Sequence, residues 1–435
     1  MNQYYSEYKR KLTSPDKAVE YIGNGETIIN SMSFAEPPAL LAAIARVVRE
    51  KDLTGIKIYS LLPLKHSAET VLAPDLCNNI TGYTWFVGSL ERGLVRTGLN
   101  YFIPCYLHQI PRLIEDHMDV DTLITTVSPM DDSGYFSLGL SNGYLLSAAK
   151  KSKKIILEVN ENMPRVFGDC QIHISEIEAV VENHVPLLEL PILDSKPEDD
   201  AIGKYIVQEI PDGATIQLGI GGLPNVICRY LANHKDIGIH TELLTPGMID
   251  LIEKGVATGR KKNLKPGKHI FTVASGNKKM YDFMNNNPSM ESYSSDYVTD
   301  PAVIARNDNM IAVNAVLEVD LLGQCNAEYL KGSTFSGTGG QLDFVRGAFN
   351  SKGGKSIHAF YSTAKNGEIS RIVPRFKSGA VITSPRADTH YVCTEYGIVN
   401  LKGKSTRERV LALISIAHPK FRDGLLKEAE EMYLM

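Results

Sequence analysis

The feature that most constrains the fold is the alternation of two kinds of segment along the chain. Short apolar runs rich in β-branched residues, such as 55–62 and 154–159, have the composition of buried parallel strands. Amphipathic stretches lie between such runs, and Pro37 and Pro38 are well placed to open one of them. Its apolar face is formed by Leu40, Leu41, Ile44, Val47 and Val48. This alternation predicts an α/β fold with parallel sheets.

A second helix is predicted near the end of the sequence. Ser405 and Glu408 have the spacing of a capping box, in which each side chain accepts a hydrogen bond from a backbone N–H group of the first turn. The apolar stripe that follows consists of Val410, Leu413, Ile414 and Ala417. We therefore expect a capped helix to begin after Ser405.

Length and proline content predict two domains. A chain of 435 residues is long enough for two or three domains. The clearest boundary is the segment 186–200, which contains three prolines and ends in an acidic cluster, as exposed connections often do. We predict two α/β domains, over residues 1–188 and 189–435.

Composition excludes several classes of protein. The 46 basic residues are balanced by 50 acidic ones, which gives a net charge of −4 and argues against a nucleic-acid partner. No apolar run approaches the roughly 18 residues of a membrane span. Residues 1–11 lack the apolar core of a signal peptide, and the six cysteines form no C-x-x-C pair. We expect a cytoplasmic protein with reduced thiols.

A glycine-rich loop follows the strand predicted at 214–218. Residues 219–225 lead from this strand into a helix predicted at 226–231, so that backbone N–H groups could bind an anion or an oxyanion. A tight turn that needs glycine is the alternative interpretation. A nicotinamide dinucleotide fingerprint fits poorly, because Pro224 stands where its third glycine would fall.

A second glycine loop lies at 336–343. The two glycine loops and Glu242 together are a combination that suits chemistry at a carbonyl group. Such chemistry needs a nucleophile and N–H donors opposite it, and Glu242 lies on a short strand predicted within 238–244. His240 would share a strand face with Glu242 and either tune it or serve as a structural histidine. The sequence has no Gly-x-Ser-x-Gly, P-loop or His-Glu-x-x-His motif, so we expect no metal site.

Several segments together resemble one family. In chain order they are 127–139, 217–225, 238–243, 313–324, 336–344 and 394–421. The ordered set is similar to the acetyl-CoA hydrolase/transferase family of class I CoA-transferases, which includes 4-hydroxybutyrate and butyrate:acetate CoA-transferases. The similarity covers nearly the whole chain.

The resemblance implies roles for individual residues. Glu242 matches the nucleophile that forms a glutamyl-CoA thioester, and the N–H groups of Ile220 and Gly340 match two oxyanion donors. The CoA-contacting turn would consist of Gly219, Ile220, Gly221, Gly222 and Leu223. Polar positions of the family's active site are matched by Asn314, Lys365 and Glu395. Without the resemblance, these three would be a strand-end residue, a solvated lysine and a helix or loop partner.

The resemblance also implies an architecture and an activity. We expect two similar α/β domains with mainly parallel sheets, an active site in the cleft between them, and a homo-oligomer, either dimer or tetramer. The activity would move CoA from an acyl-CoA, such as acetyl-CoA, to a short carboxylate such as butyrate, 4-hydroxybutyrate or itaconate. No cofactor is expected beyond coenzyme A as a substrate.

Two alternatives and the identity of the acceptor stay open at this stage. The alternatives are an acyl-CoA hydrolase on the same fold and a non-catalytic protein that binds CoA or a nucleotide. The acyl pocket has four apolar candidates in the N-terminal domain, each of which could instead belong to the core. They are Met32, Leu61, Leu62 and Phe86.

Overall fold

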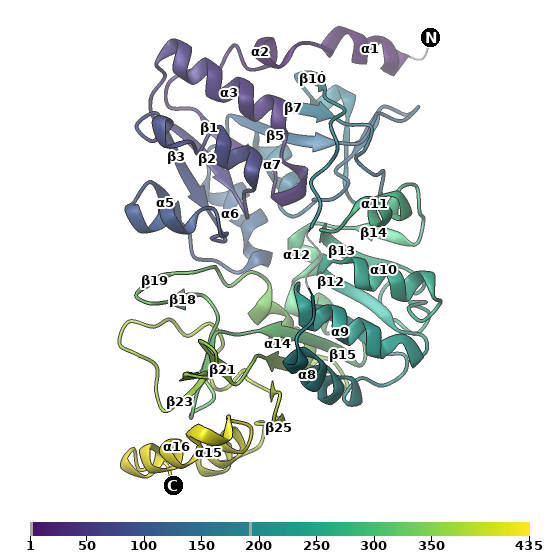
Figure 1. The fold of residues 1–435 in the computed structure, drawn as a ribbon. Coiled ribbons are helices and arrows are strands. Elements are labelled where there is room, and N and C mark those ends of the chain that lie inside the picture. The colour runs from purple at the N-terminus through teal and green to yellow at the C-terminus, as the bar shows by residue number, and fades with distance from the viewer. Residues whose placement is uncertain (1–2, 191–193) are drawn as a thin grey trace. The chain divides into compact units, whose positions relative to one another are not determined.

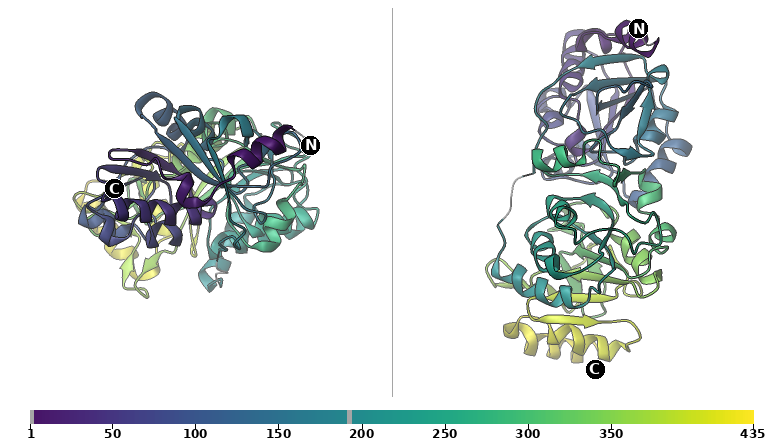
Figure 2. Two further views of the ribbon diagram at one scale, coloured as in Figure 1. Left: turned by 90° about the horizontal axis from the view of Figure 1, so that it is seen from above. Right: turned by 90° about the vertical axis from the view of Figure 1, so that its right-hand side faces the viewer.

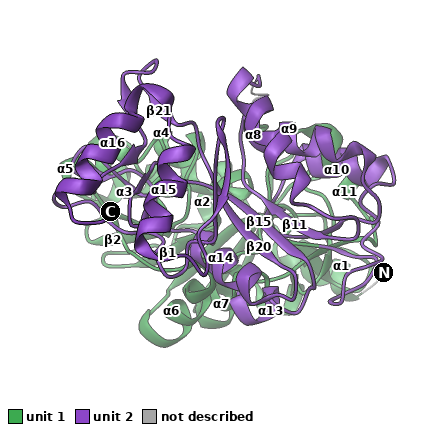
Figure 3. Cartoon of the chain, turned by 90° about the horizontal axis from the view of Figure 1, so that it is seen from below, with its two compact units in different colours: residues 1–190, 270–298 green, residues 191–269, 299–435 purple. Residues whose placement is uncertain are grey.

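The computed structural model describes residues 3–190 and 194–435 of the chain, which form two compact units (Figure 3). Unit 1 comprises residues 1–190 and 270–298, and unit 2 comprises residues 191–269 and 299–435. Each unit has a mainly parallel sheet with helices packed on it. The predicted α/β class is confirmed.

Unit 1 contains a seven-stranded sheet in the order β10-β7-β5-β1-β2-β3-β4, in which each neighbouring pair is parallel (Figure 1). Its strands are β1 (Thr27–Asn30), β2 (Ile56–Ser60), β3 (Ile80–Thr84), β4 (Asn100–Phe102), β5 (Thr122–Val127), β7 (Lys154–Val159) and β10 (Ala179–Glu182). β2 and β7 confirm the strands predicted within 55–62 and at 154–159.

Unit 1 also contains strands outside this seven-stranded sheet, together with its helices. The other strands are β6 (Tyr135–Ser137), β8 (Phe167–Gly168), β9 (Gln171–His173), β13 (His269–Ala274), whose first residue belongs to unit 2, and β14 (Met290–Ser292). The helices are α1 (Gln3–Lys11), α2 (Pro15–Ala18), α3 (Pro38–Lys51), α4 (Lys65–Glu69), α5 (Arg92–Thr97), α6 (Ile110–His117), α7 (Leu145–Lys151), α11 (Lys278–Met284) and α12 (Ser295–Val298).

Helix α3 has the form that its sequence predicts. Pro38 occupies its first turn, where a missing N–H group costs nothing. The predicted apolar face is buried against strand residues such as Ile28 and Ile56. Each apolar side chain removed from water in this way contributes about 1.5–3 kcal/mol, so this face holds the helix on the sheet.

Unit 2 has its strands in the order β25-β24-β20-β15-β11-β12, which are parallel except for the antiparallel pair β24–β25. These strands are β11 (Thr215–Leu218), β12 (Gly238–Leu244), β15 (Met310–Ala315), β20 (Lys355–Ala359), β24 (Tyr391–Thr394) and β25 (Gly397–Asn400). Short strands lie in the connections: β16 (Glu318–Asp320), β17 (Cys325–Asn326), β18 (Tyr329–Leu330), β19 (Ser333–Thr334), β21 (Thr363–Ala364), β22 (Ile369–Ser370) and β23 (Ile372–Val373).

The helices of unit 2 correct two sequence predictions. They are α8 (Pro197–Gln208), α9 (Gly222–Tyr230), α10 (Pro246–Glu253), α13 (Pro301–Ile304), α14 (Gln341–Asn350), α15 (Thr406–Ser415) and α16 (Pro419–Glu431). The prediction of a helix over 226–231 is wrong about its start, because the glycine loop itself forms the first turn of α9.

The prediction of an exposed connection over 186–200 is wrong for its last residues, which belong to a helix. Residues 191–193 of this segment lie outside the described residues. Pro197 begins α8, and the Asp199 carboxylate accepts a hydrogen bond from the Lys196 N–H group at 2.9 Å. This capping contact draws Asp199 inward, where it is 1% exposed. The acidic cluster therefore starts a helix.

The C-terminal helices α15 and α16 pack on the β24–β25 end of unit 2 (Figures 1 and 2). The predicted capping box is confirmed, since Ser405 Oγ accepts from the Glu408 N–H group and Glu408 Oε2 accepts from the Ser405 N–H group at 2.7 Å. Val410, Leu413 and Ile414 are buried in the core that these helices share with β16 and β24. Among the described helices, none combines the length and apolar character that a membrane crossing requires.

Candidate active site

Several of the predicted site residues lie at or near the carboxyl ends of the parallel strands of unit 2. Glu242 lies on β12, the first glycine loop follows β11, Asn314 is near the end of β15, and Glu395 follows β24. The carboxyl edge of a parallel sheet is where α/β proteins bind ligands, because the connecting loops converge there. Because strands and helices alternate along the chain, the strands are parallel, and the residues that follow them lie at the same edge of the sheet.

Glu242 is held by the second glycine loop. The Gly340 N–H group donates a hydrogen bond to Glu242 Oε2 at 2.9 Å, and Gly340 is the N-cap residue of α14. A Cβ atom at Gly340 would come within 2.3 Å of Glu242 Oε2, so this approach requires glycine. The N-terminus of α14 therefore faces the carboxylate with an N–H group and its positive dipole end.

The environment of Glu242 changes its protonation. The side chain is partly buried, and this burial, together with the charge of Asp343, raises the pKa of Glu242 to about 7. The hydrogen bond from Gly340 opposes that rise. A carboxylate of this kind is less solvated, and more nucleophilic when ionised, than one on an open surface.

The first glycine loop borders a pocket of about 230 Å³. Residues 219–224 form one wall, and Asn314 and Tyr361 also contribute to the lining. Gly221 has φ +120° and ψ −171°, a conformation essentially confined to glycine. Glu242, Gly340 and Lys365 are not among the described residues that line this pocket.

Three residues of this pocket were missed by the sequence analysis. The Tyr361 hydroxyl donates a hydrogen bond to Asp199 Oδ1 at 2.7 Å, and Arg371 donates to the carbonyl groups of Leu317, at 2.6 Å, and Val316. Burial lowers the pKa of Arg371 and raises that of Tyr361. Proline at the start of α8 could have identified Asp199 as a helix-start residue. Nothing in the sequence around Arg371 or Tyr361 indicates the pocket.

The other predicted residues have different surroundings. Asn314 and Gln217 exchange amide hydrogen bonds of 3.2 and 3.3 Å between β15 and β11. Glu395 accepts hydrogen bonds from the backbone N–H group, at 2.8 Å, and the hydroxyl of Ser362. Lys365 lies between β21 and β22 with φ +49°, in the turn of a short hairpin. The structure thus brings Asn314 to the pocket and does not bring Lys365 there.

Two further sequence interpretations concern histidine and metal. His240 is fully buried, and its ring lies 6.4 Å from that of Phe344 on α14, edge to face. Within the part of the chain that the structure describes, no group of three or more histidine, cysteine, aspartate or glutamate side chains could hold a metal ion.

The four apolar acyl-pocket candidates lie in unit 1, each just beyond the carboxyl end of a strand. Met32 follows β1, Leu61 and Leu62 follow β2, and Phe86 follows β3. Met32 and Leu61 are buried, whereas Leu62 and Phe86 keep partial exposure. Leu62 has φ +51°, which is uncommon for a residue with a side chain.

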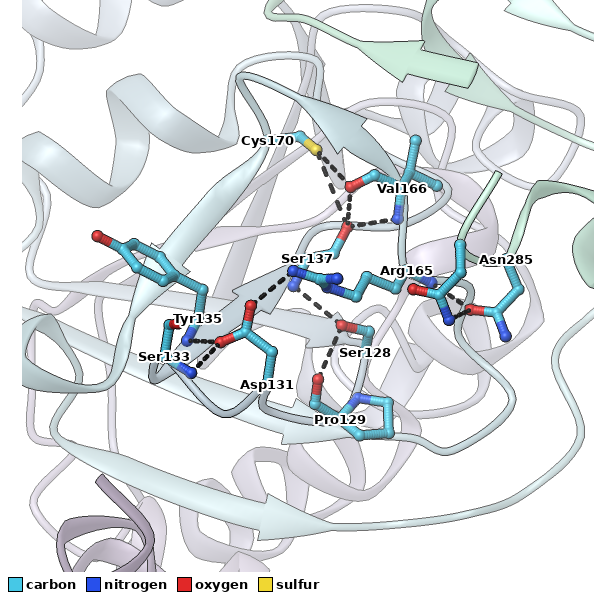
Figure 4. A network of polar contacts seen from close by, with 11 residues as sticks. Ser128, Pro129, Asp131, Ser133, Tyr135, Ser137, Arg165, Val166, Cys170 and Asn285 are labelled. Carbon is cyan, nitrogen blue, oxygen red and sulfur yellow. Dashed lines mark hydrogen bonds and ion pairs between the residues drawn. The ribbon is translucent and has the colours of Figure 1, made fainter. Parts of the chain in front are cut away.

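The segment 127–139, one of those that carry the family resemblance, forms a polar network in unit 1 (Figure 4). Asp131 pairs with Arg165 at 2.6 Å and accepts hydrogen bonds from two backbone N–H groups of its own turn. Ser128 Oγ accepts from the Ser137 N–H group at 2.9 Å. These contacts fix the turn that follows β5, which is a structural reason for the motif.

Comparison with known proteins identifies the family. The model of the acetyl-CoA hydrolase/transferase N-terminal domain matches residues 1–190, and that of the C-terminal domain matches residues 276–429. The chain belongs to the acetyl-CoA hydrolase/transferase family. The family suggested by the sequence motifs is therefore confirmed.

Individual relatives match over nearly their full length. The chain is 43% identical to succinyl-CoA:cyclohexane-1-carboxylate CoA transferase from Geobacter metallireducens, over 99% of this chain and 97% of the relative. It is 42% identical to 4-hydroxybutyrate coenzyme A transferase from Clostridium kluyveri, over 98% and 99%. The crystal structure of RipA from Yersinia pestis matches with a TM-score of 0.96 and 46% identity, over 99% of this chain and 100% of that one.

These full-length matches to transferases assign the chain to the CoA-transferases within its family. The two relatives differ in the acid that their names specify, so the comparison fixes the class of enzyme and leaves the acid to be determined.

Proposed function

We propose that this enzyme transfers CoA from an acyl-CoA, such as acetyl-CoA, to a short-chain carboxylate by a ping-pong mechanism, with Glu242 as the nucleophile. The observation that carries the proposal is the hydrogen bond from the Gly340 N–H group to Glu242 Oε2. Through this hydrogen bond the Glu242 carboxylate, whose pKa is raised, contacts an N–H donor that can stabilise negative charge on oxygen.

The first half-reaction loads CoA onto the enzyme. The ionised Glu242 attacks the carbonyl carbon of the acyl-CoA, the C–S bond breaks, and CoA leaves as the thiolate while a mixed anhydride forms. The thiolate then attacks the glutamyl carbonyl of the anhydride. The donor acid leaves as its carboxylate, and a glutamyl-CoA thioester remains.

The second half-reaction reverses these steps with a different acid. The acceptor carboxylate attacks the thioester carbonyl, which releases the CoA thiolate and forms a new anhydride. Attack of the thiolate on the acyl carbonyl of that anhydride gives the new acyl-CoA and restores Glu242. Each step passes through a tetrahedral oxyanion, for which we propose the Gly340 and Ile220 N–H groups as donors; removing one such donor typically costs 10²–10³ in rate.

The pocket of about 230 Å³ supports binding of part of CoA next to the first glycine loop. We assign contacts with CoA to residues 219–223 and Asn314, which line this pocket. Lys365 and Glu395 stay proposed contacts by family position. CoA carries phosphates, and local positive charge can bind them although the chain as a whole has a net charge of −4.

For the acceptor, we propose a short aliphatic acid such as butyrate; 4-hydroxybutyrate would need an additional polar partner for its hydroxyl group. The support is the apolar character of Met32, Leu61, Leu62 and Phe86, which all follow neighbouring strands of unit 1. Itaconate or another dicarboxylate would need an additional cationic or polar partner for its second carboxylate. A competing hydrolase would use water in place of the acceptor acid.

One experiment tests the transferase directly. The enzyme is incubated with acetyl-CoA, and the peptide that contains Glu242 is examined by mass spectrometry for a CoA adduct. A panel of carboxylic acids is then tested for release of new acyl-CoA. We expect an adduct on Glu242 and its discharge by the best acceptor.

The control variants separate the possible outcomes. Glu242→Ala should abolish both adduct and transfer, whereas Glu430→Ala, at an exposed position on α16, should keep both. Steady release of CoA and acetate without an adduct would favour the hydrolase. Absence of any turnover would favour a protein that only binds CoA.

A further inference from the structure

The segment 336–340, which holds the Gly340 N–H group next to Glu242, is rich in glycine and therefore conformationally free. Residues 336–340 include three glycines, and Gly339 has φ +55°. An oxyanion donor is effective only when its position is fixed before the reaction begins. Contacts outside these five residues must therefore hold the Gly340 N–H group in place.

Glu328 contacts this segment through both its backbone and its side chain. Its carbonyl oxygen accepts hydrogen bonds from the N–H groups of Phe335, at 2.8 Å, and Ser336, at 3.3 Å. Its carboxylate accepts one from Thr338 Oγ1 at 3.2 Å. Glu328 thus binds the segment at its entry and two residues before Gly340.

Glu328 is itself held rigidly. Its side chain is 7% exposed, and Oε1 accepts a second hydrogen bond from Thr383 Oγ1 at 3.1 Å. The Glu328 N–H group donates to Oδ1 of the fully buried Asn326 at 3.2 Å. A buried carboxylate that accepts two hydroxyl hydrogen bonds makes a stable anchor, because moving it would leave a charge without partners.

The residue that follows Gly340 is held by a second set of contacts, which shares Thr338 with the first. Gln341 Nε2 lies 3.4 Å from Nδ1 of the fully buried His358, and the Gln341 N–H group donates to the Thr338 carbonyl at 3.2 Å. Thr338 therefore takes part in both anchors. Its backbone closes the turn over Gly340, and its hydroxyl ties that turn to Glu328.

We propose that Glu328 is a positioning residue for the transfer reaction, which acts through the Thr338 hydroxyl to fix the Gly340 N–H group against Glu242. The inference rests on the proposed function of Glu242. It assigns Glu328 no contact with the substrate or with the reacting atoms. Its effect should therefore appear in the rate of the chemical steps and not in the binding of acyl-CoA.

The test removes the hydroxyl without changing the shape of the side chain. Thr338→Val loses the hydrogen bond to Glu328, and Thr338→Ser keeps it. Thr389→Val is the matched control, because Thr389 donates its buried hydroxyl to the Gly323 carbonyl at 2.7 Å, in a different part of unit 2. The measurements are the single-turnover rate of glutamyl-CoA formation from acetyl-CoA, the KM for acetyl-CoA, and the thermal midpoint.

We expect Thr338→Val to lower the single-turnover rate by about tenfold to a hundredfold, since small misplacements of catalytic groups have effects of this size. The KM should change by no more than about twofold. Thr338→Ser should restore the rate, and Thr389→Val should lower only the thermal midpoint. If Thr338→Val does not fold, Thr338→Ala is tested in its place.

A wild-type rate in Thr338→Val would overturn the proposal. Equal rate losses in Thr338→Val and Thr389→Val would also overturn it, and so would a Thr338→Ser variant that is as slow as Thr338→Val. Absence of the thioester in the wild-type enzyme is a different result. It would overturn the proposed role of Glu242, on which the role of Glu328 depends.

Discussion

The raised pKa of Glu242 predicts a steep pH dependence in the first half-reaction. With a pKa of about 7, half of the Glu242 side chains are ionised at pH 7. By the same relation, roughly 10% are ionised at pH 6 and roughly 90% at pH 8. In the proposed mechanism only the ionised carboxylate attacks the acyl-CoA, so activity is expected to rise with pH. We expect kcat/KM for acetyl-CoA to increase by roughly tenfold between pH 6 and pH 8.

The assay follows the release of acetate that accompanies glutamyl-CoA formation in a single turnover without an acceptor acid. Measurements at half-unit steps from pH 5 to 9 give the midpoint of the free enzyme, because kcat/KM reports groups of the unbound enzyme. Asp343→Asn is the informative variant. Asp343 raises the pKa of Glu242 by its negative charge, so removal of that charge should move the midpoint to lower pH.

The reasoning would be refuted by a rate that is constant from pH 6 to 8. An ordinary glutamate, with a pKa near 4.3, is almost fully ionised throughout that range, and would give such a profile. A midpoint that moves to higher pH in Asp343→Asn would also contradict the assigned electrostatics. For the wild-type enzyme and for Asp343→Asn, circular dichroism at the two pH extremes checks that the fold is retained.

Three further predictions concern glycines and a helix cap. Gly340→Ala should lower kcat by roughly 10²–10³ with little change in thermal midpoint, because the added Cβ atom displaces the Glu242 carboxylate. The control is Gly424→Ala, at a position on α16 with open space around it, which should keep full activity and stabilise the protein slightly. Gly221→Ala should cost on the order of 1–3 kcal/mol in denaturant unfolding, because φ is +120° there. Gly219→Ala, which has no positive φ and no close neighbour, should cost far less, and equal losses would contradict the strain argument. Ser405→Ala should reduce stability by about 1 kcal/mol through the lost helix cap, and an unchanged urea midpoint would show that the cap is not needed.

Local sequence patterns were sufficient for much of the fold. The apolar run at 154–159 and the proline-led helix from Pro38 appear in the structure with nearly the predicted limits. The Ser405 capping box is also present. These features depend on residues close together in the sequence, so periodicity and capping chemistry can identify them.

Predictions that depend on precise loop geometry were less successful. The start of α9 lies within residues that look like a flexible loop, and the acidic cluster after Pro197 begins α8. The return of residues 270–298 to unit 1 has no signal in the sequence, because it results from long-range packing.

The sequence by itself determined the α/β class, the two glycine loops and Glu242 as the carboxylate of interest. Only the tertiary structure decided which groups meet: Gly340, 98 residues further along, donates to Glu242, and Asp199 pairs with Tyr361 across 162 residues. It also placed Lys365 on a hairpin turn apart from the pocket lining. The physical reason is that a backbone pattern is set by neighbouring residues, whereas hydrogen bonding and burial at a site depend on how distant strands and helices pack.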